Sequence, residues 1–339
     1  MDKSNLSEKI KNRAIASGYD LCGIIPATPF YEFEQYLNKR IQDFPESKSQ
    51  YEGLQNLACP AETAKSIIVC IRKYSHYKKP EYFDGKIGKV YLFDGRLAYS
   101  KEYRAACEVS SFLDSLNIEY RRDSITARWA AEKAGLGLFG RNNFIYTKFG
   151  SYVWIDTWQV DVELNYDKTE EGAGIECLCR DDCRKCIEAC PTKALSGDYS
   201  MDKGKCVAGL SFGYGEIDDK SLWDKMGTWI YGCDVCQDVC PMNKNKLEQT
   251  AEFPLMEKTN GEITLEKLFM MDEEYFLKIV QPRFWYIGEA DMYIWKCSAL
   301  RAMANSGDPQ YHALLWEACE SEDERIRETA LWACSKLNI

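Results

Sequence analysis

The sequence has few histidines and no long apolar run. His76 and His312 are its two histidines among 339 residues, which excludes a histidine-rich zinc or copper centre. No stretch of 18 or more consecutive apolar residues occurs, so a membrane-spanning helix is not expected. The first residues lack the apolar core of a secretory signal, which favours a cytoplasmic protein.

Positive charge is also scarce, since 43 Lys and Arg face 53 Asp and Glu and the net charge is −10. A general attraction to nucleic acid needs clustered Lys and Arg, so it is not expected from this balance. A local basic patch is still compatible with the composition.

Cysteine, in contrast, is abundant. The chain has 16 cysteines, and nine of them fall between Cys177 and Cys240. In a reducing compartment such a cluster indicates a metal or redox centre rather than a disulfide framework. The other seven lie in apolar or helical contexts, where a cysteine is usually a small buried hydrophobic residue.

Two runs within this segment follow the same pattern, C-x2-C-x3-C-P. The runs are Cys183, Cys186 and Cys190 before Pro191, and Cys233, Cys236 and Cys240 before Pro241, with Cys206 between them. In bacterial ferredoxins the cysteine before proline ligates the other of two clusters. Two such endings therefore predict two [4Fe-4S] clusters.

Crossed ligation follows from this pattern and assigns four cysteines to each cluster. Cluster one takes Cys179, Cys183, Cys186 and Cys240; cluster two takes Cys190, Cys206, Cys233 and Cys236. The first ligand departs from the usual spacing, because position 180 is Arg180 and Cys179 gives C-x3-C. Cys177 is a nearby competitor. A pair of zinc knuckles is the alternative, but it leaves the two Cys-Pro endings and the lone Cys206 unexplained.

The remaining pattern predicts an α+β protein in three parts, residues 1–165, 171–250 and 260–339. Helices are expected over 5–17, 98–116 and 126–134, and strands over 66–71, 144–146 and 152–158. Residues 164–176 are typical of a linker. Two C-terminal stretches, around Ala299-Leu300 and Ala330-Leu331, are similar in sequence and lie 31 residues apart. They indicate a HEAT-type repeat or two unrelated amphipathic helices.

Three stretches resemble the epoxyqueuosine reductases, cobalamin-dependent iron–sulfur enzymes of tRNA modification, and their relatives the reductive dehalogenases. They are Arg128–Asn142, with the Ala-Gly-Leu-Gly sequence at 134–137, and the two cysteine runs at 182–195 and 230–243. The Ile-Tyr-Gly-Cys-Asp sequence that opens the last stretch is more specific than a ferredoxin motif. With Cys206 and the helical tail, the resemblance spans nearly the whole chain.

The resemblance implies a corrinoid-binding mixed α/β domain at 1–165, a ferredoxin-like double-cluster module at 171–250 and a HEAT-like helical cap at 260–339. The clusters would reduce cobalamin, which would lack a histidine ligand because no D-x-H-x-x-G motif occurs. A ferredoxin or flavodoxin is the expected electron donor. Matching the family's corrinoid-facing segments assigns the pocket to Asn142, Ile145, Thr147, Ser151, Val207, Ala208, Gly209 and Leu210.

The proton donor departs from the family's pattern. Asp123 lies 11 positions before Ala134, where the resembled family has its aspartate 13 positions before, and Ala-Pro after it is missing. Asp123 is the first candidate, with Tyr120 and Tyr146 as phenolic alternatives. The competing interpretation of Asp123 is a cap for the helix that follows, and Arg121 and Arg122 favour its charged form.

Three functions are compatible with these sequence features. The first is a corrinoid-dependent reductase; the second is an electron-transfer or corrinoid-activating protein without substrate chemistry; the third is an RNA-binding protein with structural clusters. The large N-terminal part favours the first, since a carrier needs only the cluster module. Between residues 292 and 339 the net charge is −2, which disfavours tRNA as the substrate.

Overall fold

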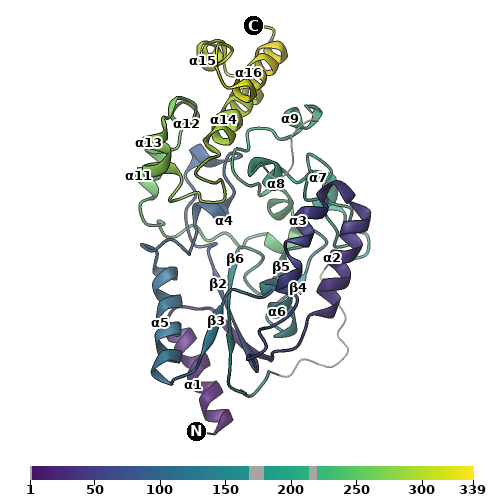
Figure 1. Ribbon diagram of the computed structural model, residues 1–339, viewed down its shortest axis with the longest axis vertical. Coiled ribbons are helices and arrows are strands. Elements are labelled where there is room, and N and C mark those ends of the chain that lie inside the picture. The colour runs from purple at the N-terminus through teal and green to yellow at the C-terminus, as the bar shows by residue number, and fades with distance from the viewer. Residues whose placement is uncertain (1, 168–178, 214–219) are drawn as a thin grey trace.

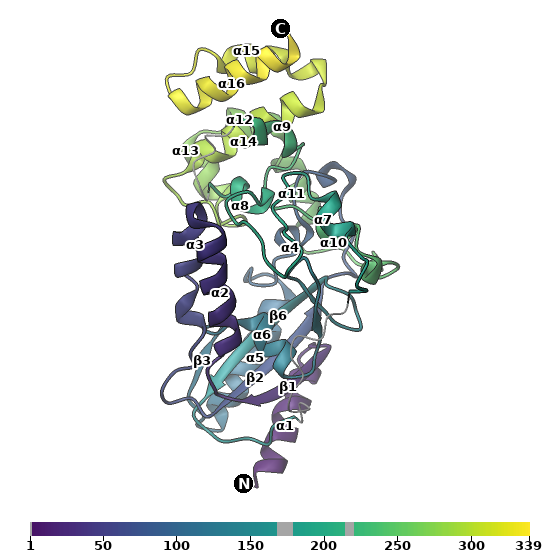
Figure 2. The same cartoon turned by 90° about the vertical axis from the view of Figure 1, so that its right-hand side faces the viewer.

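The structure is a computed structural model that describes residues 2–167, 179–213 and 220–339 (Figure 1). It is a mixed α/β protein. In both views the N-terminus and the last two helices lie at opposite ends of an elongated molecule (Figures 1 and 2). Cys177 and most of the expected linker fall outside the described residues.

The N-terminal part is built on a four-stranded antiparallel sheet with strand order β1-β2-β6-β3. Its strands are β1 (Leu21–Pro26), β2 (Ser66–Lys73), β3 (Tyr120–Arg122) and β6 (Val153–Val160); a separate hairpin pairs β4 (Leu138–Phe139) with β5 (Ile145–Tyr146). Its helices are α1 (Lys3–Ala16), α2 (Tyr31–Asp43), α3 (Lys48–Glu52), α4 (Lys89–Leu92), α5 (Lys101–Ser115) and α6 (Ala127–Lys133).

Both faces of the sheet are covered, which explains why β2 is apolar from Ile67 to Ile71. Ile68 and Cys70 face a core shared with α1 and α5, whereas Ile67, Val69 and Ile71 face a core shared with α2 and α6. The alternation follows from the two-residue period of a strand.

Each expected helix and strand of the N-terminal part has a counterpart in the structure. The helix expected from 98 begins only at Lys101, because the Ser100 hydroxyl accepts a hydrogen bond from the Tyr103 amide and caps it. The sequence analysis did not predict β1, α2 or β3. The motif at 126–134 is α6, and Gly135 with φ +67° ends it.

In its described residues, the cysteine-rich part has four short α-helices joined by loops. They are α7 (Lys185–Ala189), α8 (Val207–Ser211), α9 (Ser221–Lys225) and α10 (Val235–Asp238). Figure 2 shows α7, α8 and α10 between the sheet and the C-terminal helices.

The C-terminal part is helical and shares one core with residues 74–97 of the N-terminal part. It contains α11 (Met256–Glu262), α12 (Leu265–Met270), α13 (Glu273–Tyr275), α14 (Met292–Ser306), α15 (His312–Ala318) and α16 (Glu324–Leu337). The two echoing stretches lie on α14 and α16, which pack together. Their burial differs, because Leu300 is fully buried and Leu331 is 56% exposed. No helix in the described ranges is long and apolar enough to cross a membrane.

Candidate metal centre and its surroundings

Four cysteines from two loops come together around the start of α7. Burial raises the pKa of Cys186 to about 11, and the negative charges of Cys179, Cys240 and Cys183 add to that effect. Three of these thiols come from the first run, and Cys240 comes from the end of the second. The structure thus brings together the four cysteines that the sequence analysis assigned to cluster one.

A second set of thiols forms around α8 and α10. Burial raises the pKa of Cys236, and Cys206 and Cys233 are the next largest causes, followed by Cys186 of the first set and by Cys190. Cys190 also acts on Cys206 and on Cys233. These are the four cysteines assigned to cluster two, with Cys190 contributed by the first run.

Backbone amides point at the sulfurs of this second set. The Cys206 sulfur accepts hydrogen bonds from the amides of Ala208 and Gly209 at the start of α8, and Cys233 accepts one from Val235. Amides aimed at a sulfur stabilise its thiolate form, which is the form that ligates a metal.

The two proline endings have the same local geometry. Cys190 ends α7 with φ −60° and ψ 114°, and Cys240 precedes a short 3₁₀ turn with φ −73° and ψ 125°. Proline disfavours helical backbone in the residue before it, so both cysteines leave their helices in extended conformation. Within the described residues, no three Cys, His, Asp or Glu side chains are close enough to ligate a single metal ion. In an iron–sulfur cluster each thiol binds a different iron, so the thiols need not be close enough to share a single metal ion.

The loop after β4 ties the N-terminal part to both sets of cysteines. The Arg141 amide donates to the Cys179 sulfur (3.4 Å), and its guanidinium donates to the Cys183 carbonyl (2.8 Å). The Asn142 amide group donates to the Cys236 carbonyl (2.9 Å) and to the Tyr146 hydroxyl (2.9 Å). Asn142 therefore positions the ligand loops, whatever else it contacts.

The other predicted pocket residues near β5 have varied surroundings. Ile145 is buried in the core under α6, and the Thr147 hydroxyl bonds to the Gly150 carbonyl. Ser151 is buried, and its hydroxyl donates to Gln237 on α10 (2.8 Å) and accepts from Asn243 (2.8 Å). Ser151 thus joins β6 to the cysteine-rich part.

The four predicted pocket residues of α8 follow Cys206 directly. Val207 and Leu210 are buried in a small apolar core with Leu222 and Met226, and Ala208 is half-buried. A Cβ atom at Gly209 would lie 2.3 Å from the Lys203 carbonyl oxygen, so glycine is required there. A pocket role for these residues stays a prediction.

Asp123 belongs to a network of charged groups at the end of β3. Its carboxylate accepts a hydrogen bond from the Thr157 amide (2.9 Å) and forms an ion pair with the Arg122 guanidinium (3.0 Å). It does not cap α6, whose first turn begins after Thr126, so the capping interpretation is wrong. Arg121 forms no ion pair with Asp123 in the described residues.

The rest of this network was missed by the sequence analysis. Asp156 on β6 is buried and forms ion pairs with Arg72 (2.9 Å) and Arg122 (3.3 Å), while the Tyr19 hydroxyl donates to it (2.7 Å). Burial raises the pKa of Asp123, and the charge of Asp156 raises it further; the Thr157 amide and Arg122 lower it. Burial and the charge of Asp156 therefore outweigh the effect of Arg122 on the pKa of Asp123.

The two phenolic alternatives differ in position. Tyr120 packs against the core between the sheet and α1 and α5. Tyr146 is buried, and its hydroxyl bonds to the Cys240 sulfur and accepts from Asn142. Tyr146 is thus a neighbour of the cluster-one cysteines.

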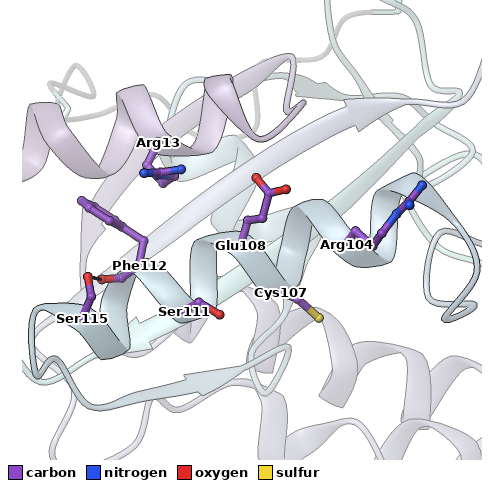
Figure 3. Close-up of a pocket in the computed structure, with 7 residues that line it drawn as sticks. All are labelled: Arg13, Arg104, Cys107, Glu108, Ser111, Phe112 and Ser115. Carbon is purple, nitrogen blue, oxygen red and sulfur yellow. Dashed lines mark hydrogen bonds between the residues drawn. The ribbon is translucent and has the colours of Figure 1, made fainter.

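The surface has grooves at several places, two of which lie beside the elements described above. One, of about 730 Å3, lies between α2 and the cluster-one loop and is lined by Tyr36, Lys39, Arg141 and Arg184 among others. The other, of about 540 Å3, lies between α1 and α5 (Figure 3). Its lining includes Arg13, which lies 5.2 Å from the centre of the Phe112 ring, and none of the eight predicted ligands.

Comparisons with known proteins agree with this arrangement. The family described as "4Fe-4S double cluster binding domain" matches residues 178–243. An epoxyqueuosine reductase of Leadbetterella byssophila is 32% identical over 254 residues, which cover 70% of this chain and 80% of that protein. Another, of Cellulophaga algicola, is 30% identical over 262 residues, which cover 71% and 80%.

Solved structures show the same overall fold. A structure of epoxyqueuosine reductase with an epoxyqueuosine-modified tRNA-Tyr stem loop has a TM-score of 0.79 and 25% identity, covering 99% of this chain and 91% of that one. The enzyme from Streptococcus thermophilus has a TM-score of 0.76 and 23% identity, covering 98% and 90%.

Proposed function

Because the chain belongs to the epoxyqueuosine reductase family, we propose that it removes the epoxide oxygen of a modified nucleoside in tRNA. The observation that carries the proposal is the convergence of eight cysteines, in two sets of four, against the loop that follows β4. A protein that only carries electrons would need neither the large sheet nor the charged network at Asp123.

Cobalamin is the proposed second cofactor, and one feature of the structure fits it. Arg128 keeps exposed surface although desolvation lowers its pKa to about 10, which indicates a concave place surrounded by protein. The charges of Arg128 and Cys206 both shift the pKa of Lys203, so the surroundings of Arg128 lie close to the cluster-two cysteines. When bound, cobalamin would supply a strongly reducing cobalt centre.

The cysteines provide the electron path in this proposal. Removal of an epoxide oxygen consumes two electrons and two protons and releases water. Cys186 and Cys190 are four residues apart on and just after α7, which corresponds to about 6 Å along a helix axis. Ligation of different clusters by these two cysteines would keep the clusters within a short electron-transfer distance.

Asp123 is the proposed proton donor. Its side chain is 42% exposed, so a substrate can reach it, and burial of its remaining surface together with Asp156 raises its pKa. A raised pKa helps a carboxylic acid to hold a proton until the reaction requires it. Tyr120 and Tyr146 are second choices, because one packs into a core and the other bonds to a predicted ligand.

The proposal includes the finer divisions of the chain. We assign residues 1–165 to corrinoid binding, 171–250 to the clusters and 260–339 to a HEAT-like cap. The wall of the corrinoid pocket is assigned to the predicted residues between 142 and 151 and to the four residues that follow Cys206. A cytoplasmic location belongs to the same proposal.

The expectation against tRNA is not supported by the comparisons, since a similar structure contains a tRNA stem loop. The net charge of a tail averages over all its faces, whereas RNA is bound by the few cations that face it. The electron donor in this proposal is a ferredoxin or flavodoxin. The groove beside the cluster-one loop, lined by Lys39, Arg141 and Arg184 together with Asp181 and Asp198, is the proposed docking place for this donor.

The test is a single-turnover assay with a stem loop that carries epoxyqueuosine. The chain, anaerobically reconstituted and loaded with cobalamin, is mixed with the RNA and a low-potential reductant, and the nucleosides are analysed by mass spectrometry. We expect a product that lacks one oxygen atom, and its loss in Cys206→Ser. An inactive protein with full clusters and bound corrinoid would instead favour the electron-transfer function.

A further inference from the structure

Three positively charged side chains from distant parts of the chain lie together beside α8. They are Arg40 of α2, Arg128 of α6 and Lys203, three residues before Cys206. Arg40 and Arg128 are joined by Asn143: one guanidinium donates to its side-chain oxygen and the other to its carbonyl. Arg40 also donates to the Tyr199 carbonyl, which places it next to the loop that carries Lys203.

The two arginines have no carboxylate partner. Among the described residues, neither Arg40 nor Arg128 forms an ion pair with Asp or Glu, and the buried Arg40 Nε has no hydrogen-bond partner. Asp202, the nearest acid in sequence to Lys203, accepts from the Ser47 hydroxyl (2.8 Å) and pairs with Lys205 (3.2 Å). Within the described residues, the charges of Arg40 and Arg128 therefore have no carboxylate to balance them.

Desolvation acts on all three groups, and repulsion by a neighbouring arginine acts on Arg128 and Lys203. Burial lowers the pKa of Arg40, and burial together with the charge of Arg40 lowers the pKa of Arg128 to about 10. Burial and the charge of Arg128 likewise lower the pKa of Lys203. Like charges that are partly desolvated cost free energy, and a bound anion would offset that cost.

Arg301 is a buried arginine that differs from Arg128 in its accessibility to a ligand from solution. Desolvation also lowers the pKa of Arg301 on α14 to about 10, but Arg301 is only 4% exposed and donates to Ser298 in the same helix. No ligand can reach it. Arg128, in contrast, is an exposed residue, so an anion from solution can bind there.

We propose that Arg40, Arg128 and Lys203 bind one phosphodiester group. Arginine guanidinium groups bind phosphate oxygens through paired hydrogen bonds, and lysine adds a compact charge. Two ligands of the proposed function carry such a group: the nucleotide tail of cobalamin and the RNA backbone. The inference rests on that proposed function, and the position next to Cys206 and α8 favours the cobalamin tail.

The experiment compares two corrinoids that differ in this group. Hydroxocobalamin contains the nucleotide tail with its phosphodiester, and dicyanocobinamide lacks both. Their affinities are measured by absorbance titration of the reconstituted full chain, with iron content matched between variants. We expect Arg128→Gln to weaken cobalamin binding at least about tenfold, because the variant loses a charged hydrogen-bond donor to the phosphate. Cobinamide binding should change less than twofold.

Two further variants separate the site from general effects. Lys203→Gln should also weaken cobalamin selectively, and it remains informative if Arg128→Gln fails to fold. Arg121→Gln, on exposed β3 surface, should leave both affinities unchanged. Equal weakening of cobalamin and cobinamide in Arg128→Gln and Lys203→Gln would overturn the proposal, because it would indicate a packing role.

An RNA titration distinguishes the second source. Binding of the modified stem loop is measured by fluorescence anisotropy at several salt concentrations. If RNA supplies the phosphodiester, Arg128→Gln lowers the salt dependence by about one phosphate contact and cobalamin affinity is unchanged. Unchanged cobalamin and RNA binding in both variants would refute the site. If the parent chain binds RNA but neither corrinoid, the proposal of cobalamin as cofactor is refuted. The RNA titration of the variants then still tests whether Arg128 and Lys203 bind a phosphodiester.

Discussion

The sheet and the cysteine-rich part of this chain depend on different sources of stability. Among the described residues, the two faces of the sheet bury 16 and 14 hydrophobic residues, whereas each small core around α7 and α8 contains four. Burial of each large apolar side chain contributes about 1.5–3 kcal/mol, so the sheet can be stable by packing alone. The cysteine-rich part needs ligation, as small metal domains generally do.

Removal of iron should separate the two regions most strongly. After anaerobic chelation we expect the backbone amides of residues 180–213 and 220–243 to lose hydrogen-exchange protection almost completely. Strands β2 and β6 should keep theirs. The measurement is hydrogen exchange with mass spectrometry, with the iron-loaded chain as the reference. Retained protection around α7 and α10 without iron would show that packing suffices there.

The Cys190→Ser variant tests the connection between the two cysteine runs. The parent should contain about eight irons per chain, because two [4Fe-4S] clusters are expected. Cys190→Ser should retain about half and lose the cluster held by Cys206, Cys233 and Cys236, although Cys190 lies in the first run. Iron analysis and electron paramagnetic resonance measure this. Cys59→Ser, at an exposed and distant cysteine, is the control.

Asp123→Asn tests whether the sheet contributes chemistry as well as stability. Loss of a proton donor should lower turnover about 10²- to 10⁴-fold at matched cluster and corrinoid content. Because the acid must be protonated, activity of the parent should fall as the pH rises through the raised pKa of Asp123. The variant should lose this dependence. Unchanged turnover would move the search to the tyrosines; Asp114→Asn, on the exposed face of α5, is the control.

Lys89→Met tests a buried ion pair that joins the two regions. The Lys89 ammonium lies 3.2 Å from Asp234 and 2.7 Å from Asp238, and Asp234 is fully buried. Removing Lys89 leaves Asp234 with a more distant cation, Lys79 at 4.0 Å. We expect a loss of about 3–5 kcal/mol in the free energy of unfolding of the iron-loaded chain.

The control for this pair is Lys48→Met, since the Lys48–Glu52 pair on α3 is exposed. It should change stability by less than about 0.5 kcal/mol, because exposed ion pairs contribute little. Equal effects of the two variants in denaturant titrations would contradict a special role for the Lys89–Asp234 pair.

The smallest expected effect is that of Cys177→Ser, which tests the identity of the first ligand of cluster one. Cys177→Ser should keep about eight irons, whereas Cys179→Ser should lose cluster one. The proximity of Cys179 to Cys186, and the Arg141 amide that bonds to its sulfur, favour Cys179. Full iron content in Cys179→Ser with loss in Cys177→Ser would reverse the assignment.

The sequence by itself determined the local features of both regions. Cysteine spacing with proline after Cys190 and Cys240 predicts two clusters, because ligand spacing and the backbone before proline are local properties. The apolar run of β2 and the glycine after α6 predicted their elements for the same reason. The strands β1 and β3 were missed, since they are short and pairing with β2 and β6 stabilises them. The helix α2 was also missed, although its buried residues Phe33 and Leu37 lie at helical spacing.

The tertiary structure alone decided which charges meet. The sequence showed Arg121 and Arg122 beside Asp123, but it could not show that Asp156 and Arg72 complete the network. Arg40, Arg128 and Lys203 are likewise separated by many residues and come together only when α2, α6 and the loop before α8 pack around Asn143. Desolvation and charge repulsion depend on distances through space, and spacing along the chain does not record those distances.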